Sequence, residues 1–209
     1  MFFKAGLFSL MLLLASRVLG VLRETALATA FGSSGMADVV IVMLTLPDWL
    51  AGFLVSGALA YVLLPHWAKE SAAQQNTSQS RVTGRLMLMA IVLAAVMCIA
   101  QAPLGALLVP GVSASLQSAA SEAVVWSALA MPAAILAGLW ATRLQHERDF
   151  VGLYSANLVV NAVLIAALVY VVWQGGGAAA GPTLGIFLLL AVALRLLWQG
   201  WRLRHLRHS

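Results

Sequence analysis

The sequence predicts an all-α, polytopic membrane protein with six transmembrane helices. Hydrophobic residues make up 62% of its 209 residues and charged residues only 9%, whereas soluble domains are about 25% charged. The apolar residues fall into six segments, each near the ~20 residues that a helix needs to cross a bilayer. We expect a single transmembrane domain over residues 1–209, with spans at about 5–31, 38–64, 86–109, 123–142, 150–173 and 183–201.

The connections between these segments predict the orientation in the membrane. The first, third and fifth connections contain no Lys or Arg, whereas nine of the twelve basic residues fall in the second and fourth connections and at the two ends of the chain. By the positive-inside rule, both termini are expected in the cytoplasm. The net charge of +5 therefore reflects membrane orientation, and no nucleic-acid partner is expected. A cleaved signal peptide is not expected, because Arg17 directly follows the short apolar run Ala5–Ala15.

The longest polar connection, His66–Arg85, is expected to be a flexible cytoplasmic connector that is too short for a domain. No nucleotide-binding loop occurs anywhere in the chain, so any transport is expected to draw on a gradient rather than on ATP hydrolysis.

Arg17 and Arg23 lie inside the first predicted span, close to Glu24 and Asp38. An arginine at the centre of a bilayer helix costs about 2.5–3.5 kcal/mol on insertion scales, so such residues mark a functional site by default. Helix geometry places the two arginines about 120° and 9 Å apart, on the wall of one wide cavity. Two interpretations stay open: Glu24 or Asp38 neutralises an arginine in a structural pair, or the guanidinium groups bind phosphate oxygens.

The polar residues within the predicted spans also include Arg195, Asp48 and Asn161. Arg195 is expected to extend its side chain to the cytoplasmic interface near the basic tail. Asp48 follows Pro47 and is able to use backbone groups that the proline frees, and Asn161 is suited either to interhelical hydrogen bonds or to substrate contact. The histidines lack metal-ligand spacing and the serines lack a His/Asp partner set. We therefore predict no enzyme activity, no catalytic residue, no cofactor and no metal.

Several segments resemble the MurJ/MviN family of bacterial lipid II flippases, within the superfamily of multidrug and oligosaccharidyl-lipid exporters. The specific part of the resemblance is amino-terminal, and a weaker match follows. The matching segments are SRVLGVLRE (16–24), AFGSSGMAD (30–38), LPDWLAGFLVSGALAYVLLP (46–65), MPAAILAGLWATRLQHERDF (131–150) and YSANLVVNAVLI (154–165).

The resemblance implies one six-helix lobe of a two-lobe flippase in the bacterial inner membrane. Such a protein moves a polyprenyl-pyrophosphate-linked saccharide from the cytoplasmic to the periplasmic leaflet during cell-envelope biogenesis. It implies substrate-binding roles for Arg17, Arg23 and Asp38, with Glu24, Asp48 and Asn161 as further candidates for the cavity. The expected partners are the lipid-linked pyrophosphate sugar, membrane lipids and a second lobe, whether another copy, a separate chain or a carboxyl half.

The chain departs from the family pattern where the family has an arginine pair and a glutamate. Ala51 and Gly52 replace the arginines and Ser56 replaces the glutamate. Because one of those arginines belongs to the family's substrate cavity, an exopolysaccharide or O-antigen unit is expected to fit better than lipid II. Two alternatives remain: a cation or drug antiporter of the same superfamily, and an accessory lobe that does not transport alone.

Overall fold

The computed structural model describes residues 2–32, 34–53, 60–176 and 180–208. Helices and short turns account for these residues, with no strand among them, which confirms the all-α prediction. The helices are α1 (Phe2–Phe31), α2 (Gly35–Ala51), α3 (Ala60–Ala68), α4 (Ala72–Ile99), α5 (Gln101–Leu108), α6 (Ala114–His146), α7 (Phe150–Trp173) and α8 (Ala180–His208).

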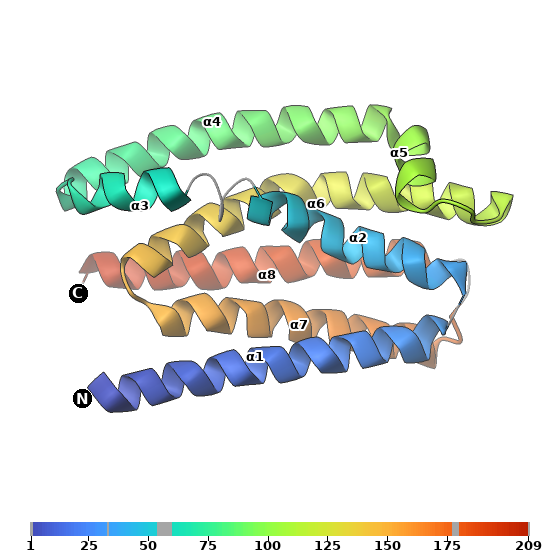
Figure 1. Cartoon of the computed structure of the whole chain (residues 1–209), viewed down its shortest axis with the longest axis horizontal. Helices are drawn as coiled ribbons and strands as arrows, with labels where there is room; N and C mark the ends of the chain where they lie inside the picture. The colour runs from blue at the N-terminus through green and yellow to red at the C-terminus, as the bar shows by residue number, and fades with distance from the viewer. Residues whose placement is uncertain (1, 33, 54–59, 177–179, 209) are drawn as a thin grey trace.

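The number of long helices differs from the six predicted. In the described part of the chain, five helices are long and apolar enough to cross a membrane: α1, α4, α6, α7 and α8. The second predicted span, 38–64, contains α2, which ends at Ala51, and the start of α3 at Ala60, while residues 54–59 lie outside the described residues. The 17 residues of α2 extend about 25 Å, which is less than the ~30 Å hydrocarbon core. Figure 1 shows α2 and α3 following one another along the bundle.

The third predicted span is divided. Helix α4 ends at Ile99 and α5 begins at Gln101, with Ala100 between them at φ −92° and ψ 21°. Pro103 accounts for the break, because it has no N–H to offer the carbonyl four residues before it and is tolerated only in the first turn of a helix. Gly105 then lets α5 lie directly against α6: a Cβ there would stand 2.9 Å from the backbone nitrogen of Ser121.

The prediction of a flexible connector at 66–85 is wrong. Helix α4 begins at Ala72, and the polar residues that follow continue the same helix into its apolar part. The start is fixed by a capping box in which the Gln74 N–H donates to Ser71 Oγ at 3.4 Å and the Ser71 N–H donates to Gln74 Oε1 at 2.9 Å. The sequence signal was the S-x-x-Q pattern at Ser71.

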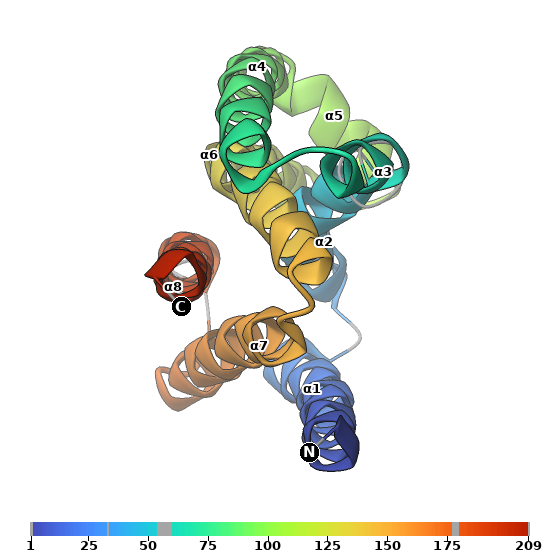
Figure 2. The same ribbon diagram turned by 90° about the vertical axis from the view of Figure 1, so that its left-hand side faces the viewer.

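The helices form an elongated bundle around α6 (Figures 1 and 2). Helix α6 contributes to both hydrophobic clusters: Ala123 and Ala130 pack among α2, α7 and α8, while Met131 and Ile135 pack among α2, α3 and α4. On the other side of the bundle, α1 packs on α7 and α7 packs on α8. In the end-on view of Figure 2, α1 lies beside α7 and apart from α2, which packs on α6.

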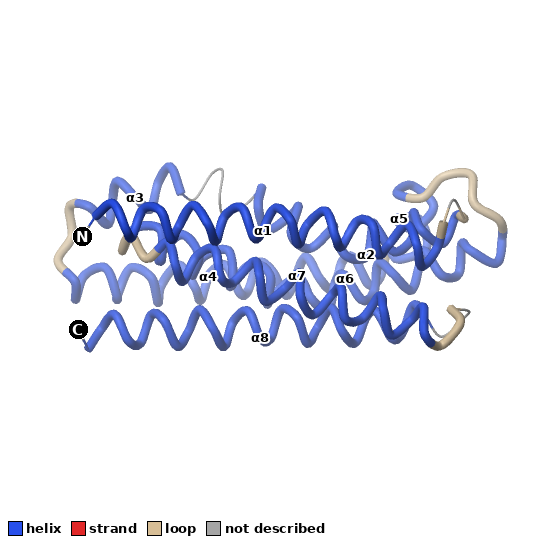
Figure 3. The backbone as a smooth tube through the Cα atoms, turned by 90° about the horizontal axis from the view of Figure 1, so that it is seen from below, coloured by secondary structure: helices blue, strands red, loops and turns tan. Residues whose placement is uncertain are grey.

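The two described ends of the chain lie at the same end of the bundle (Figures 1 and 3). The turns that join α3 to α4 and α6 to α7 lie at this end too, whereas α1–α2, α5–α6 and α7–α8 are joined at the opposite end. The connections rich in Lys and Arg therefore gather at one end of the molecule. This is the geometry that the alternating loop charges predict.

Candidate functional site

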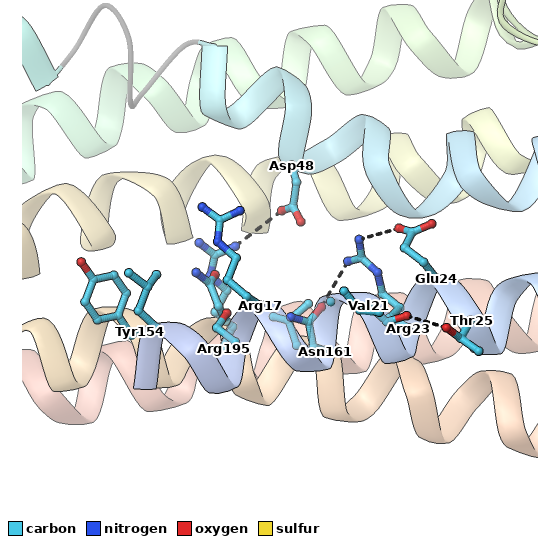
Figure 4. A pocket seen from close by; sticks show the side chains of 14 residues that line it. Arg17, Val21, Arg23, Glu24, Thr25, Asp48, Tyr154, Asn161 and Arg195 are labelled. Carbon is cyan, nitrogen blue, oxygen red and sulfur yellow. Dashed lines mark hydrogen bonds and ion pairs between the residues drawn. The ribbon is translucent and has the colours of Figure 1, made fainter. Parts of the chain in front are cut away.

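A cavity of about 730 Å³ lies between α1, α2, α7 and α8. It collects most of the intramembrane charged residues (Figure 4). Its lining comprises Leu13, Ser16, Arg17, Gly20, Val21, Arg23, Glu24, Thr25, Asp48, Tyr154, Asn157, Val160, Asn161 and Arg195.

Helix α1 supplies the longest wall. Arg17, Gly20 and Glu24 follow each other at spacings of three and four residues, which places them on one helix face. A Cβ added at Gly20 would meet nothing within 4 Å, so this glycine leaves the wall open between the two charged side chains. The cavity therefore runs along α1 rather than crossing it, with Arg17 and Arg195 toward one end and Arg23 and Glu24 toward the other (Figure 4).

Arg23 has two partners, and neither contact is short. Its Nη1 donates to Asn161 Oδ1 at 3.2 Å and its Nη2 lies 3.2 Å from Glu24 Oε1. Charge-assisted N–H···O bonds are usually about 2.7–2.9 Å long. The Glu24 side chain is also 61% exposed. The structural pair considered for Arg23 is thus present, but it is a loose one.

Arg195 reaches into this cavity from α8, so the interpretation that it extends to the basic tail is wrong. Its Nη1 lies 3.5 Å from Asp48 Oδ1, and its side chain is only 15% exposed. Its buried Nε has no hydrogen-bond partner among the described residues. The opposite charges of Asp48 and Arg195, each in an apolar segment, were the sequence signal for this pair, since intramembrane charges usually pair with one another.

Arg17 differs from the other two arginines. Its side chain is exposed to the cavity, and within the described residues its guanidinium forms no hydrogen bond or ion pair. The five charged residues of the lining, three arginines with Glu24 and Asp48, leave one net positive charge. A planar guanidinium with free N–H groups is suited to phosphate or carboxylate oxygens, which it binds in pairs.

The other predicted site residues divide into two groups. Asn161 and Asp48 lie in the cavity lining as expected of cavity candidates, whereas Asp38 lies exposed in the first turn of α2 and is absent from that lining. Substrate binding by Asp38 stays a prediction. Tyr154 also lines the cavity, but an aromatic residue near a helix end carries no sequence signal that distinguishes it from the other interfacial aromatics.

The positions that depart from the family pattern also differ in environment. Ala51 is buried in the cluster with α3, α4 and α6, whereas a Cβ at Gly52 would meet nothing within 4 Å. Neither residue lines the cavity. Ser56 lies outside the described residues. No three His, Cys, Asp or Glu side chains gather as around a metal ion in the described part of the chain.

The long apolar helices define a multi-pass helical membrane protein, and its cavity is lined by arginines. Comparison with known families finds a match over residues 27–207 to the family described as "Lipid II flippase MurJ". The chain belongs to this family, whose members are membrane transporters rather than enzymes. The matched region includes Asp48, Asn161 and Arg195, whereas Arg17, Arg23 and Glu24 lie before it. No curated protein and no solved structure matches.

Proposed function

We propose that this chain is a flippase lobe whose cavity binds the pyrophosphate of a polyprenyl-linked saccharide. The observation that carries the proposal is the convergence of Arg17, Arg23 and Arg195, from two different helices, on one cavity of about 730 Å³. Membership of the lipid II flippase family supports a lipid-linked substrate. The shared pyrophosphate defines the substrate class, with a lipid II-like molecule and an exopolysaccharide or O-antigen unit as its members.

The distribution of partners supports a pyrophosphate. Within the described residues, the guanidinium of Arg17 has no partner, and Arg195 has a free Nε and one long contact to Asp48. Two guanidinium groups at one end of the cavity match the two phosphoryl groups of a pyrophosphate, because each can hold a pair of oxygens. Arg23 is held by Asn161 and Glu24 at the other end of the cavity, and we propose that it contacts the phosphate or the first sugar.

The exposed apolar face of α1 is compatible with a second lobe as a partner. Large apolar side chains of α1 next to the arginines are exposed, with Leu14 at 56%, Val18 at 58% and Val21 at 66%. This surface suits a polyprenyl chain, surrounding membrane lipid or the apolar face of another lobe, since none of these offers hydrogen bonds. We propose that transport requires a second lobe on this side, with both termini cytoplasmic and movement toward the periplasm.

A binding measurement on the purified chain in lipid nanodiscs tests the cavity directly. The probes are a polyprenyl pyrophosphate and the corresponding polyprenol, which differ only in the charged group. We expect the pyrophosphate to bind in preference to the alcohol. Arg17→Ala should weaken pyrophosphate binding about 10- to 100-fold, the range for hydrogen bonds to a charged group.

Arg85→Ala is the matched control, because Arg85 is an exposed arginine on α4, outside the cavity. Equal losses for the Arg17 and Arg85 variants would contradict a specific site. Efflux of cationic drugs that is unaffected by Arg17→Ala and abolished by Asp48→Asn would favour the antiporter instead. In this structure Asp48 and Glu24 are both paired with arginines, which disfavours cation binding.

A further inference from the structure

A second cavity, of about 270 Å³, lies between α4, α6 and α8 at the end of the bundle that holds both termini. It is separate from the arginine-lined cavity, and its occupant is inferred independently of the proposed function. Its walls come from the first turns of α4 and the last turns of α6 and α8. The lining residues are Ala72, Asn76, Gln79, Arg143, Glu147, Leu203, Leu206 and Arg207.

Three of these side chains carry a buried polar atom without a partner. Asn76 Oδ1, Gln79 Oε1 and Arg143 Nη1 form no hydrogen bond within the described residues. Gln79 and Arg143 are each only 7% exposed. Buried polar atoms are normally hydrogen-bonded, so three such atoms around one cavity indicate a polar occupant. One water needs only about 10–15 Å³ of comparable volume, so the space is suited to a larger group.

The charges and the free atoms define the chemistry of that occupant. Arg143 Nη2 pairs with Glu147 Oε1 at 2.9 Å, and the guanidinium lies 5.2 Å from the centre of the Trp67 ring. These contacts fix Arg143 while leaving Nη1 free to donate. Arg207 adds a second cation, so the lining carries one net positive charge. An occupant that satisfies the site accepts hydrogen bonds from guanidinium groups and donates hydrogen bonds to the amide oxygens of Asn76 and Gln79.

We propose that this cavity binds a phosphate ester of an alcohol with free hydroxyl groups. The occupant is the phosphoglycerol headgroup of an anionic phospholipid. The phosphate accepts from Arg143 and Arg207, and the glycerol hydroxyls donate to Asn76 and Gln79. A lipid source is favoured by position, because the cavity lies where the basic connections gather, and basic pockets between helices at the cytoplasmic interface bind acidic headgroups. Leu203 and Leu206 supply apolar contacts for the glycerol carbons.

Lipid binding to the purified full chain, measured by native mass spectrometry from a neutral detergent, tests this site. Phosphatidylglycerol is the lipid probe, phosphatidylcholine is the control headgroup without hydroxyls, and glycerol 3-phosphate is the soluble source of the same chemistry. We expect phosphatidylglycerol to bind more tightly than phosphatidylcholine. Arg207→Gln should weaken phosphatidylglycerol binding about fivefold, as expected for one basic residue at an acidic headgroup.

Arg204→Gln is the matched variant, since it makes the same charge change three residues away on the same exposed helix end but outside the cavity. It should change the affinity less than twofold. Gln79→Leu tests the buried acceptor and should weaken binding about threefold or more. If Gln79→Leu does not fold, the exposed Arg207 variant still decides the outcome.

Equal losses for Arg204→Gln and Arg207→Gln would overturn the site in favour of diffuse surface charge. The site would also be overturned if phosphatidylglycerol bound no better than phosphatidylcholine and glycerol 3-phosphate did not bind at all. Arg207-dependent binding of glycerol 3-phosphate without selective binding of phosphatidylglycerol would overturn the lipid source and assign the cavity to a soluble phosphate.

Discussion

Two ion pairs made by helix α8 differ in the length of their contacts and in whether their donors are satisfied. Arg195 and Arg202 lie seven residues, or about two turns, apart on α8, and each pairs with an aspartate from another part of the chain. Arg202 Nε donates to Asp149 Oδ2 at 2.7 Å and Nη2 donates to Asp149 Oδ1 at 2.6 Å. Arg195 meets Asp48 through a single contact of 3.5 Å, and its Nε has no partner in the described region.

The surroundings of the Asp149–Arg202 pair leave little capacity for a ligand. Asp149 Oδ1 also accepts from the Gly152 N–H at 3.0 Å, which caps α7. Trp198 Nε1 donates to the Gly152 carbonyl oxygen at 2.9 Å, so α8 holds the start of α7 through a second bond. A pair with its hydrogen bonds satisfied stabilises the fold, whereas a pair with free donors and a long contact is available to a substrate. We therefore propose that the state of the donors distinguishes the structural Arg202 from Arg195 as a binding residue.

Removal of the Asp149 carboxylate should have the largest effect. Asp149→Asn retains a good helix-capping side chain but leaves Arg202 without its partner. We expect the free energy of unfolding to fall by about 2–3 kcal/mol, somewhat below the ~3–5 kcal/mol of a fully buried pair, because Arg202 is partly exposed. Chemical unfolding of the purified protein measures this. Asp48→Asn should lower stability by less than about 1 kcal/mol, and equal losses for the two variants would remove the distinction.

Acidification of the wild type should reproduce part of the loss in the free energy of unfolding that is expected for Asp149→Asn. Burial alone raises the pKa of Asp149, but the hydrogen bonds from Arg202 and from the Gly152 N–H outweigh it and lower the pKa below its usual value. The unfolded chain therefore binds the proton more readily than the folded protein. The stabilisation is fully present above the unfolded pKa of about 3.9 and is lost as the pH falls through the folded pKa.

Unfolding of the wild type and of Asp149→Asn at pH 7 and near pH 3 isolates this carboxylate from the others. The difference in stability between the two proteins should be smaller at the acidic pH. A difference that stayed constant or grew on acidification would contradict the lowered pKa.

Replacement of Arg195 should affect binding rather than stability. Arg195→Met keeps the length of the side chain and removes its charge, so we expect at least about tenfold weaker binding of polyprenyl pyrophosphate. The melting temperature should stay the same or rise, because a buried charge with incomplete partners is replaced by an apolar side chain. Arg202→Met should do the reverse, lowering the melting temperature while the folded protein keeps its affinity. Binding assays and melting curves on both variants provide the crossed comparison.

Asp48→Asn should tighten pyrophosphate binding. The substitution removes a negative charge from the cavity and frees Arg195 Nη1. Because the contact is long and the Asp48 side chain is 49% exposed, the gain should be about three- to fivefold, which corresponds to less than about 1 kcal/mol. Titration of the same nanodisc preparation measures it. Weaker binding by this variant would mean that Asp48 orients Arg195 for the substrate instead of competing for it.

Glu24→Gln should have the smallest effect on stability. Its pair with Arg23 is exposed, and such pairs contribute about 0.2–1 kcal/mol. We expect a loss at the lower end of that range, measured by chemical unfolding beside Asp149→Asn. A loss close to that of Asp149→Asn would show that the loose cavity pairs are structural after all.

Much of the fold was predictable because a membrane imposes simple rules on sequence. Spans at 150–173 and 123–142 stand out as apolar runs, and Trp173 and Arg143 mark their ends. The failures occurred where local chemistry overrode hydropathy. Pro103 ended α4 within an apolar run, and the capping box at Ser71 started that helix within a polar one. In the second predicted span, hydropathy continues past Ala51, where α2 ends, into residues 54–59, which the structure does not describe.

The candidate site was predictable only in part. Arg17 and Arg23 were recognised because an arginine in an apolar span is costly wherever it lies. Arg195 was assigned to the interface because its distance from the basic tail along the helix permitted it. Only the position of α2 beside the cavity, which brings Asp48 to Arg195, corrected that interpretation.

The sequence by itself determined the helical membrane class, the alternation of the connections between two ends, and the presence of arginines that need a polar environment. These properties depend on composition and on spacing along one helix, which the chain specifies directly. The tertiary structure decided which arginines share a cavity, that Arg202 outside it is already satisfied by Asp149, and which polar atoms remain free. Those outcomes depend on how helices far apart in sequence pack, and the free energy of a charge in a membrane is set by the partners that this packing provides.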